Sequence, residues 1–127
     1  MKKEKFSIEY ILNNVSSLSL WNQLTTSMGL SSWFADKVAV KNNEYTFTWH
    51  TEEQKANAIL ILPEVCIRYR WINEPDPIAY FEFHIHTMEL TGVTALEITD
   101  FAEPGEKEDA IDLWDSQVYI LKRTLGI

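Results

Sequence analysis

Cysteine, glycine and long apolar runs are all scarce in this sequence. Cys66 is the only cysteine, which excludes an internal disulfide and fits a reducing compartment. The four glycines leave little room for a phosphate-binding loop, a dinucleotide fingerprint or a nucleophile elbow, and none of these motifs occurs. No apolar run approaches the ~18 residues of a membrane span, and the N-terminal stretch lacks the apolar region of a signal peptide. We therefore expect a cytoplasmic protein without membrane insertion.

Basic residues are also few. The chain has 11 Lys and Arg against 19 Asp and Glu, so its net charge is -8. Lys2, Lys3 and Lys5 form the only basic cluster, with Glu4 among them. Because phosphate binding needs clustered basic side chains, the composition argues against nucleic acid and anionic membranes as partners.

Aromatic residues, in contrast, are abundant. The 127 residues include five Trp, five Tyr and six Phe, and 46% are hydrophobic, which is typical of a globular domain. The length, without repeats or linkers, predicts one domain over residues 1–127. Aromatic side chains in this number either line a pocket for an apolar ligand or simply fill the core, and composition leaves both open.

Alternating residues predict an antiparallel sheet. Residues 5–12 alternate as a half-buried strand, and residues 37–50 form a hairpin turning at Asn42-Asn43, which pairs Val40 with Tyr45.

Residues 55–72 predict a second hairpin, turning at Pro63-Glu64 and pairing Leu62 with Val65. That register places Ala58 opposite Tyr69 and Ala56 opposite Trp71, with Leu60 and Ile67 on the same face. Small residues opposite large ones suit a curved sheet over a cavity, and packing alone also explains them. Ile59 and Ile61 then lie on the outer face, an excess that can mark a surface covered by another subunit.

Residues 78–101 predict a third hairpin with its turn at Thr91-Gly92, pairing Leu90 with Val93.

Two helical regions complete the pattern. Ser16 or Ser17 can cap a short helix, and a second short turn ends at Gly29. Residues 106–125 form one long helix with acidic first turns and Lys122 near its end, as the helix dipole prefers. Its apolar stripe consists of Ile111, Trp114, Val118, Leu121 and Leu125.

The segment EFHIHTM, residues 82–88, contains two histidines two residues apart. In the predicted register His86 faces Glu97, and both lie on the polar face of the sheet. Two such histidines with a glutamate can hold a metal, but an open sheet face lacks the dry, supported surroundings of a catalytic metal. We interpret the segment as a solvated strand face and expect no metal site.

Five segments, in this order and at these spacings, carry a resemblance to a known family: LWNQLTTSMGLSSWFAD (20–36), YTFTW (45–49), IRYRW (67–71), TGVTALEITDF (91–101) and LWDSQVYILKRTLG (113–126). With the order of elements, they resemble the START-like or birch-pollen-allergen-like superfamily. The resemblance covers nearly the whole chain, and the nearest members are small bacterial proteins similar to the C-terminal domain of heat-shock-protein-90 ATPase activators. It implies an α+β helix-grip fold, in which a curved seven-stranded antiparallel sheet wraps around a long C-terminal helix and two short helices follow the first strand.

The first functional hypothesis is a module that binds a small hydrophobic or amphipathic ligand. The cavity lies between the sheet and the C-terminal helix, and neither a cofactor nor a catalytic residue is expected. The predicted lining is Tyr10, Tyr45, Phe47, Trp49, Tyr69, Trp71, Phe83, Ile98, Trp114, Val118 and Leu121.

Two other hypotheses remain open. A protein-interaction module would bind a chaperone or a second copy of the chain through Leu30, Trp33 and Phe34, provided that this cluster is exposed. An enzyme would use Tyr45, Tyr69 or Asp100 as acid or base in the cavity, although we read Asp100 first as a residue of the loop that enters the long helix. The discriminating feature is a cavity of ~300 Å³ or more.

Overall fold

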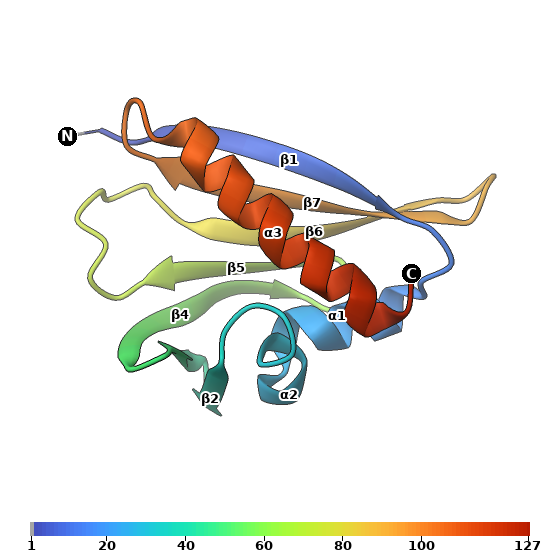
Figure 1. Cartoon of the computed structure of the whole chain (residues 1–127), viewed down its shortest axis with the longest axis horizontal. Coiled ribbons are helices and arrows are strands. Elements are labelled where there is room, and N and C mark those ends of the chain that lie inside the picture. The colour runs from blue at the N-terminus through green and yellow to red at the C-terminus, as the bar shows by residue number, and fades with distance from the viewer. Residues whose placement is uncertain (1) are drawn as a thin grey trace.

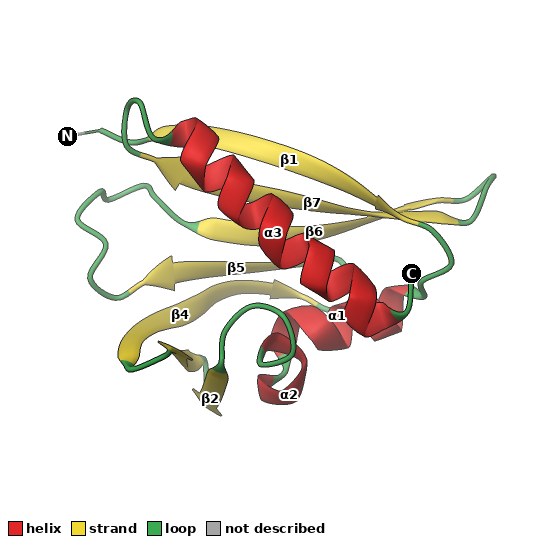
Figure 2. Cartoon of the chain, viewed as in Figure 1, coloured by secondary structure: helices red, strands yellow, loops and turns green. Residues whose placement is uncertain are grey.

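A computed structural model describes residues 2–127 as a seven-stranded antiparallel sheet and three helices (Figures 1 and 2). The strand order is β1-β7-β6-β5-β4-β3-β2. The long helix α3 crosses one face of this sheet, and α1 and α2 lie near the C-terminal end of α3 (Figure 1). The predicted α+β helix-grip fold is therefore confirmed. The strands are β1 (Glu4–Leu12), β2 (Lys37–Lys41), β3 (Glu44–Trp49), β4 (Glu52–Leu62), β5 (Cys66–Trp71), β6 (Phe81–Met88) and β7 (Val93–Ala102), and the helices are α1 (Ser17–Thr25), α2 (Ser27–Leu30) and α3 (Lys107–Leu125).

The short helices begin where capping predicts. The Ser16 hydroxyl accepts a hydrogen bond from the backbone N–H of Ser19 and starts α1. Thr26 does the same for the N–H of Gly29 at the start of α2. A side chain at position 29 would collide with the backbone carbonyl of Asn22, so only glycine lets α2 pack this closely on α1.

Helix α3 matches its sequence pattern. Trp114, Val118 and Leu121 are buried in the core, as the apolar stripe predicts. The helix ends at Gly126, which adopts the left-handed conformation (φ 78°) that favours glycine. Within residues 2–127, no helix is both long and apolar enough to span a membrane.

The hairpin registers were predicted with mixed success. The first is confirmed, because Val40 pairs with Tyr45. In the third, Met88 rather than Leu90 pairs with Val93, so residues 89–92 form a longer loop. This shift moves the pairing by two residues, and every side chain therefore keeps its predicted face.

The second hairpin contains a β-bulge that the sequence did not reveal. Leu62 pairs with Cys66, not with Val65. The register shifts between Ala58 and Leu60, so Ala58 still pairs with Tyr69 as predicted. Beyond the bulge the faces exchange, and Leu60 pairs with the outward-facing Arg68 rather than joining the inner face.

The inner face of the sheet is filled with aromatic rings at its centre. Over the small side chains of Ala56 and Ala58, the rings of β3 and β5 meet directly. Tyr45 and Tyr69 have ring centroids 5.0 Å apart, and Phe47 and Trp71 are 5.7 Å apart. The alanines thus make room for neighbouring rings, and the core at this point is solid.

Candidate functional site

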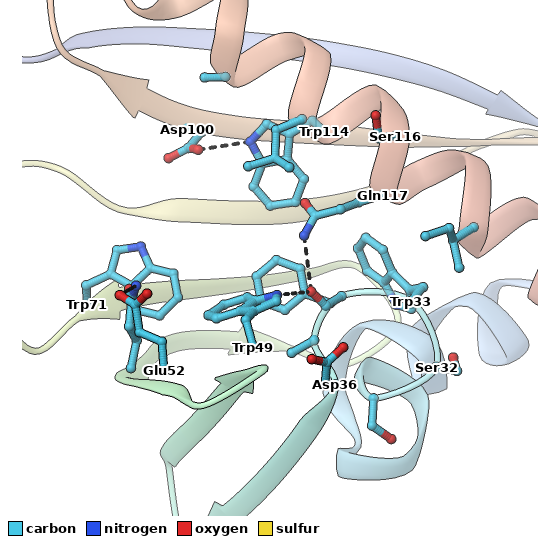
Figure 3. Close-up of a pocket in the computed structure, with 17 residues that line it drawn as sticks. Ser32, Trp33, Asp36, Trp49, Glu52, Trp71, Asp100, Trp114, Ser116 and Gln117 are labelled. Atoms are coloured by element: carbon cyan, nitrogen blue, oxygen red, sulfur yellow. Dashed lines mark hydrogen bonds between the residues drawn. The ribbon is translucent and has the colours of Figure 1, made fainter.

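A groove of about 830 Å³ lies beside α3, along residues 110–120 of the helix. Its walls come from α3, the loop of residues 31–36, and the ends of β3, β4, β5 and β7 (Figure 3). The lining residues are Ser31, Ser32, Trp33, Phe34, Ala35, Asp36, Trp49, Glu52, Gln54, Trp71, Asp100, Ala110, Leu113, Trp114, Ser116, Gln117 and Ile120. Segments far apart in the sequence therefore form one site.

Four tryptophans form much of the wall. Trp49 ends β3 and Trp71 ends β5, and their ring centroids are 6.3 Å apart. Trp114 comes from α3, and Trp33 comes from the loop of residues 31–36. The indole N–H of Trp49 donates to the Phe34 carbonyl (2.8 Å), and that of Trp33 to the Gln23 carbonyl (2.8 Å). The Trp49 and Trp33 donors thus have partners within the protein. Trp49 and Trp71 are partly exposed, whereas Trp33 and Trp114 are 4% and 6% exposed, so Trp49 and Trp71 offer most of the indole surface to a ligand.

The loop of residues 31–36 is fixed by Phe34. Its carbonyl accepts hydrogen bonds from the Trp49 indole and from the Gln117 side chain (3.1 Å), as Figure 3 shows. Its ring stacks on Trp114, with centroids 5.8 Å apart and an interplanar angle of 18°. The loop thereby links the sheet to α3.

The same packing corrects a prediction. The interaction hypothesis required Leu30, Trp33 and Phe34 to be exposed, but they are 0%, 4% and 4% exposed. The prediction was wrong because the loop folds inward over the core.

Asp100 lies on the inner face of β7 at the edge of the groove. Its carboxylate accepts hydrogen bonds from the Trp114 indole (2.9 Å) and from the Phe101 backbone N–H (2.7 Å). Burial raises its pKa to about 6, although both hydrogen bonds oppose that rise. Our reading of Asp100 as a loop residue was wrong, because β7 continues to Ala102.

All charged residues that line the groove are acidic. They are Asp36, Glu52 and Asp100, from three different elements. The Asp36 carboxylate accepts the backbone N–H of His50 (2.6 Å). Glu52 faces Trp49 across the β3–β4 hairpin.

The structure divides the predicted lining residues into two groups. Trp49, Trp71 and Trp114 line the groove. Tyr45, Phe47, Tyr69, Phe83, Ile98, Val118 and Leu121 lie in the solid core, and Tyr10 is partly buried and bonds to Asp115 of α3 through its hydroxyl (2.6 Å). Whether any of the eleven contacts a ligand stays a prediction.

Glu52 and Gln54 are groove residues that the sequence reasoning missed, although a signal existed. Alternation backwards along β4 from Ala58 and Ala56 places both on the inner face. Polar side chains are more typical of the solvated face of a sheet, so Glu52 and Gln54 did not match the pattern of a pocket lining. The 31–36 loop had no such signal, because periodicity does not predict how a loop folds.

The two core tyrosines use their hydroxyls within the protein. Tyr45 donates to the Thr25 carbonyl (2.8 Å) and Tyr69 to the Leu24 carbonyl (2.7 Å). Burial raises the pKa of both phenols. Of the three residues considered as acid or base, Asp100 is therefore the one that borders the groove.

The histidine segment lies on the outer face. The rings of His84 and His86 stack 4.3 Å apart, and His86 Nε2 lies 2.9 Å from Glu97 Oε1. His84, His86 and Glu97 are partly exposed and close enough together to hold a cation.

Glu82 lies on the face that was predicted to be solvated, but its side chain is buried and accepts a hydrogen bond from Arg68 (2.7 Å). Neighbouring Cys66 is also buried, and burial together with Glu82 raises the pKa of its thiol to about 11.

These features define a helix-grip protein with an aromatic groove beside its C-terminal helix. The family model for the START-like superfamily domain matches residues 1–127. The chain belongs to the START-like superfamily. The resemblance seen in the sequence is confirmed, and the fold supports a ligand-binding or interaction module in general.

Several solved structures of bacterial proteins are similar to this chain. The solution structure of BfR322 from Bacteroides fragilis is 43% identical, with 100% of this chain and 94% of that chain covered and a TM-score of 0.72. The Aha1 dimer from Colwellia psychrerythraea is 16% identical, with 98% and 97% covered and a TM-score of 0.81. The crystal structure of MLL2253 from Mesorhizobium loti is 15% identical, with 97% of both chains covered and a TM-score of 0.79. The last two likenesses concern the fold alone, and a search of curated proteins found no match.

Proposed function

We propose that this protein binds a small hydrophobic or amphipathic ligand in the groove between α3 and the ends of β3, β4 and β5. The observation that carries the proposal is a groove of about 830 Å³ with four tryptophans in its wall. Ligand sites of roughly 300–1,000 Å³ with aromatic walls and a few polar groups are typical of small-molecule binding.

Apolar contact supplies the driving force for this binding. Each Å² of apolar surface removed from water contributes about 25 cal/mol, so a ligand that buries roughly 200 Å² gains ~5 kcal/mol before association costs. Ser32, Ser116 and Gln117 contribute polar groups to the lining, and these can orient the polar end of an amphipathic molecule.

The first test is native mass spectrometry of the protein purified from the cell that makes it. We expect a reproducible extra mass that leaves on mild denaturation. The variant Ala110→Phe fills the groove from α3 and should lose that mass. Ala39→Phe makes the same change at an exposed site on β2 and should retain it. The proposal would be contradicted if the wild type and both variants showed only the mass of the ligand-free protein and bound no added compound with a ten-carbon alkyl chain.

A second candidate function is self-association or binding of a partner such as a chaperone. It is favoured by exposed apolar side chains around the β4–β5 hairpin, where Ile59, Leu62 and Val65 are 52%, 47% and 43% exposed. The Aha1 relative was solved as a dimer. Sedimentation over a hundredfold concentration range should then show a dimer that Ile59→Lys dissociates. A monomer at every concentration would remove self-association, and a chaperone partner would need its own binding test.

A further inference from the structure

We propose that the ligand of this groove carries a positive charge at its polar end. Hydrophobic amines and ammonium compounds would then bind more tightly than fatty acids or alkyl sulfates of the same length. This inference rests on the proposed function, since it names the class of ligand for the same site.

The charges of the lining are the first support. Asp36, Glu52 and Asp100 lie at separate places around the groove (Figure 3). None of the residues that line it is Lys, Arg or His. An anionic head group placed here would lie near carboxylates without a cation to pair with, whereas a cationic one would gain from each of them.

Strand alternation keeps the nearby basic side chains away. Arg68 and Arg70 lie on the face of β5 opposite Trp71. Arg68 bonds to Glu82, and Arg70 donates to the backbone carbonyls of Glu74, Asp76 and Ala79. These arginines are therefore committed to the outer face and cannot neutralise Glu52 from within the groove.

Aromatic faces next to a carboxylate are the second support. Glu52 pairs with Trp49 across the hairpin, and both line the groove together with Trp71. The two indole rings are 6.3 Å apart and tilted by 58°. A cation beside these ring faces is attracted by their negative quadrupoles as well as by the carboxylate. We therefore place the charged head at Trp49, Trp71 and Glu52, and the apolar tail toward Leu113 and Trp114.

The test compares three probes with the same ten-carbon chain: decyltrimethylammonium, decanoate and decyl maltoside, all below their micelle concentrations. Tryptophan fluorescence and calorimetry measure binding. We expect decyltrimethylammonium to bind about tenfold more tightly than decanoate. Glu52→Gln should remove most of that preference.

Glu53→Gln is the matched control for overall charge. It removes one negative charge from the adjacent position of the same strand, but Glu53 pairs with Thr48 on the opposite face. It should retain the full preference, whereas an effect of net charge alone would respond equally to both variants.

The outcomes separate this inference from the proposed function. If no probe binds, the cationic class is overturned, and if native mass spectra also show only the ligand-free protein, the binding function fails with it. If decanoate or decyl maltoside binds as tightly as decyltrimethylammonium, the binding function stands and the cationic class is overturned. Equal loss of preference in Glu52→Gln and Glu53→Gln would also overturn it.

Discussion

Two regions of the same interface, between the inner sheet face and α3, differ sharply in packing. In the solid region, Phe47, Tyr69 and Phe83 are completely buried. In the groove region, Leu113 and Ile120 of α3 are 61% and 46% exposed. One continuous sheet face thus has a filled half and an open half.

The inner face of β4 helps to explain the difference. In the solid region it carries Ala56 and Ala58, and aromatic rings from both neighbouring strands close over them. In the groove region it carries Glu52 and Gln54, whose polar groups are costly to bury without partners. Small residues in a sheet therefore do not by themselves create a cavity, whereas polar residues next to tryptophans can keep a groove open.

The largest effect should come from removing a ring in the solid region. We expect Phe47→Ala to lower the free energy of unfolding by about 3–5 kcal/mol, because it leaves a cavity in a packed core. Leu113→Ala at the groove rim should change it by less than about 0.5 kcal/mol. Urea unfolding of both variants measures the contrast, and similar losses would mean that the two regions do not differ as described.

The next effect concerns Asp100, at the border between the regions. Its pKa rises from 3.8 to about 6 on folding, so the folded state holds its proton more tightly than the unfolded state. Stability from this group is present below about pH 4 and is lost as the pH rises to about 6, by up to about 3 kcal/mol.

Asp100→Asn should abolish this pH dependence while still offering an oxygen to the Trp114 indole. Unfolding free energies at pH 4, 5, 6 and 7 should therefore show the wild type losing stability relative to the variant as the pH rises. Parallel profiles would show that Asp100 titrates normally and that the site is more hydrated than its burial indicates.

The smallest effect compares two tyrosine hydroxyls. Tyr69→Phe removes a buried donor and leaves the Leu24 carbonyl without it, which should cost about 1–2 kcal/mol. Tyr10→Phe removes a more exposed hydrogen bond to Asp115 and should cost about 0.5 kcal/mol or less. Thermal unfolding of the pair measures the contrast. Equal costs would show that water does not replace the Asp115 contact.

The sequence predicted face assignment better than register. An error of two residues in the β6–β7 hairpin left the placement of His84 and Glu97 intact, because side chains alternate with a period of two. The bulge near Ile59 was invisible, since its neighbours Leu60 and Ile61 are both apolar and suit either face. Leu60 was therefore assigned to the wrong side.

The predicted ligand lining shares three residues with the groove, all of them tryptophans. Trp49, Trp71 and Trp114 followed from strand alternation and from the helical stripe, which are local patterns. Asp36 and the loop around Phe34 could not follow from such patterns, because contacts with distant residues fix them. The Phe34 carbonyl bonds to Gln117, more than eighty residues further along the chain, and Asp36 bonds to Thr48 and His50 of the neighbouring hairpin.

The sequence by itself determined the elements of this protein: its alternating strands, its capped helices, its acidic surface and its membership of the START-like superfamily. Only the tertiary structure decided which part of the inner face is solid and which is open. The physical reason is that secondary structure follows from residues close together in the chain, whereas an empty volume depends on how distant side chains fill the space between them.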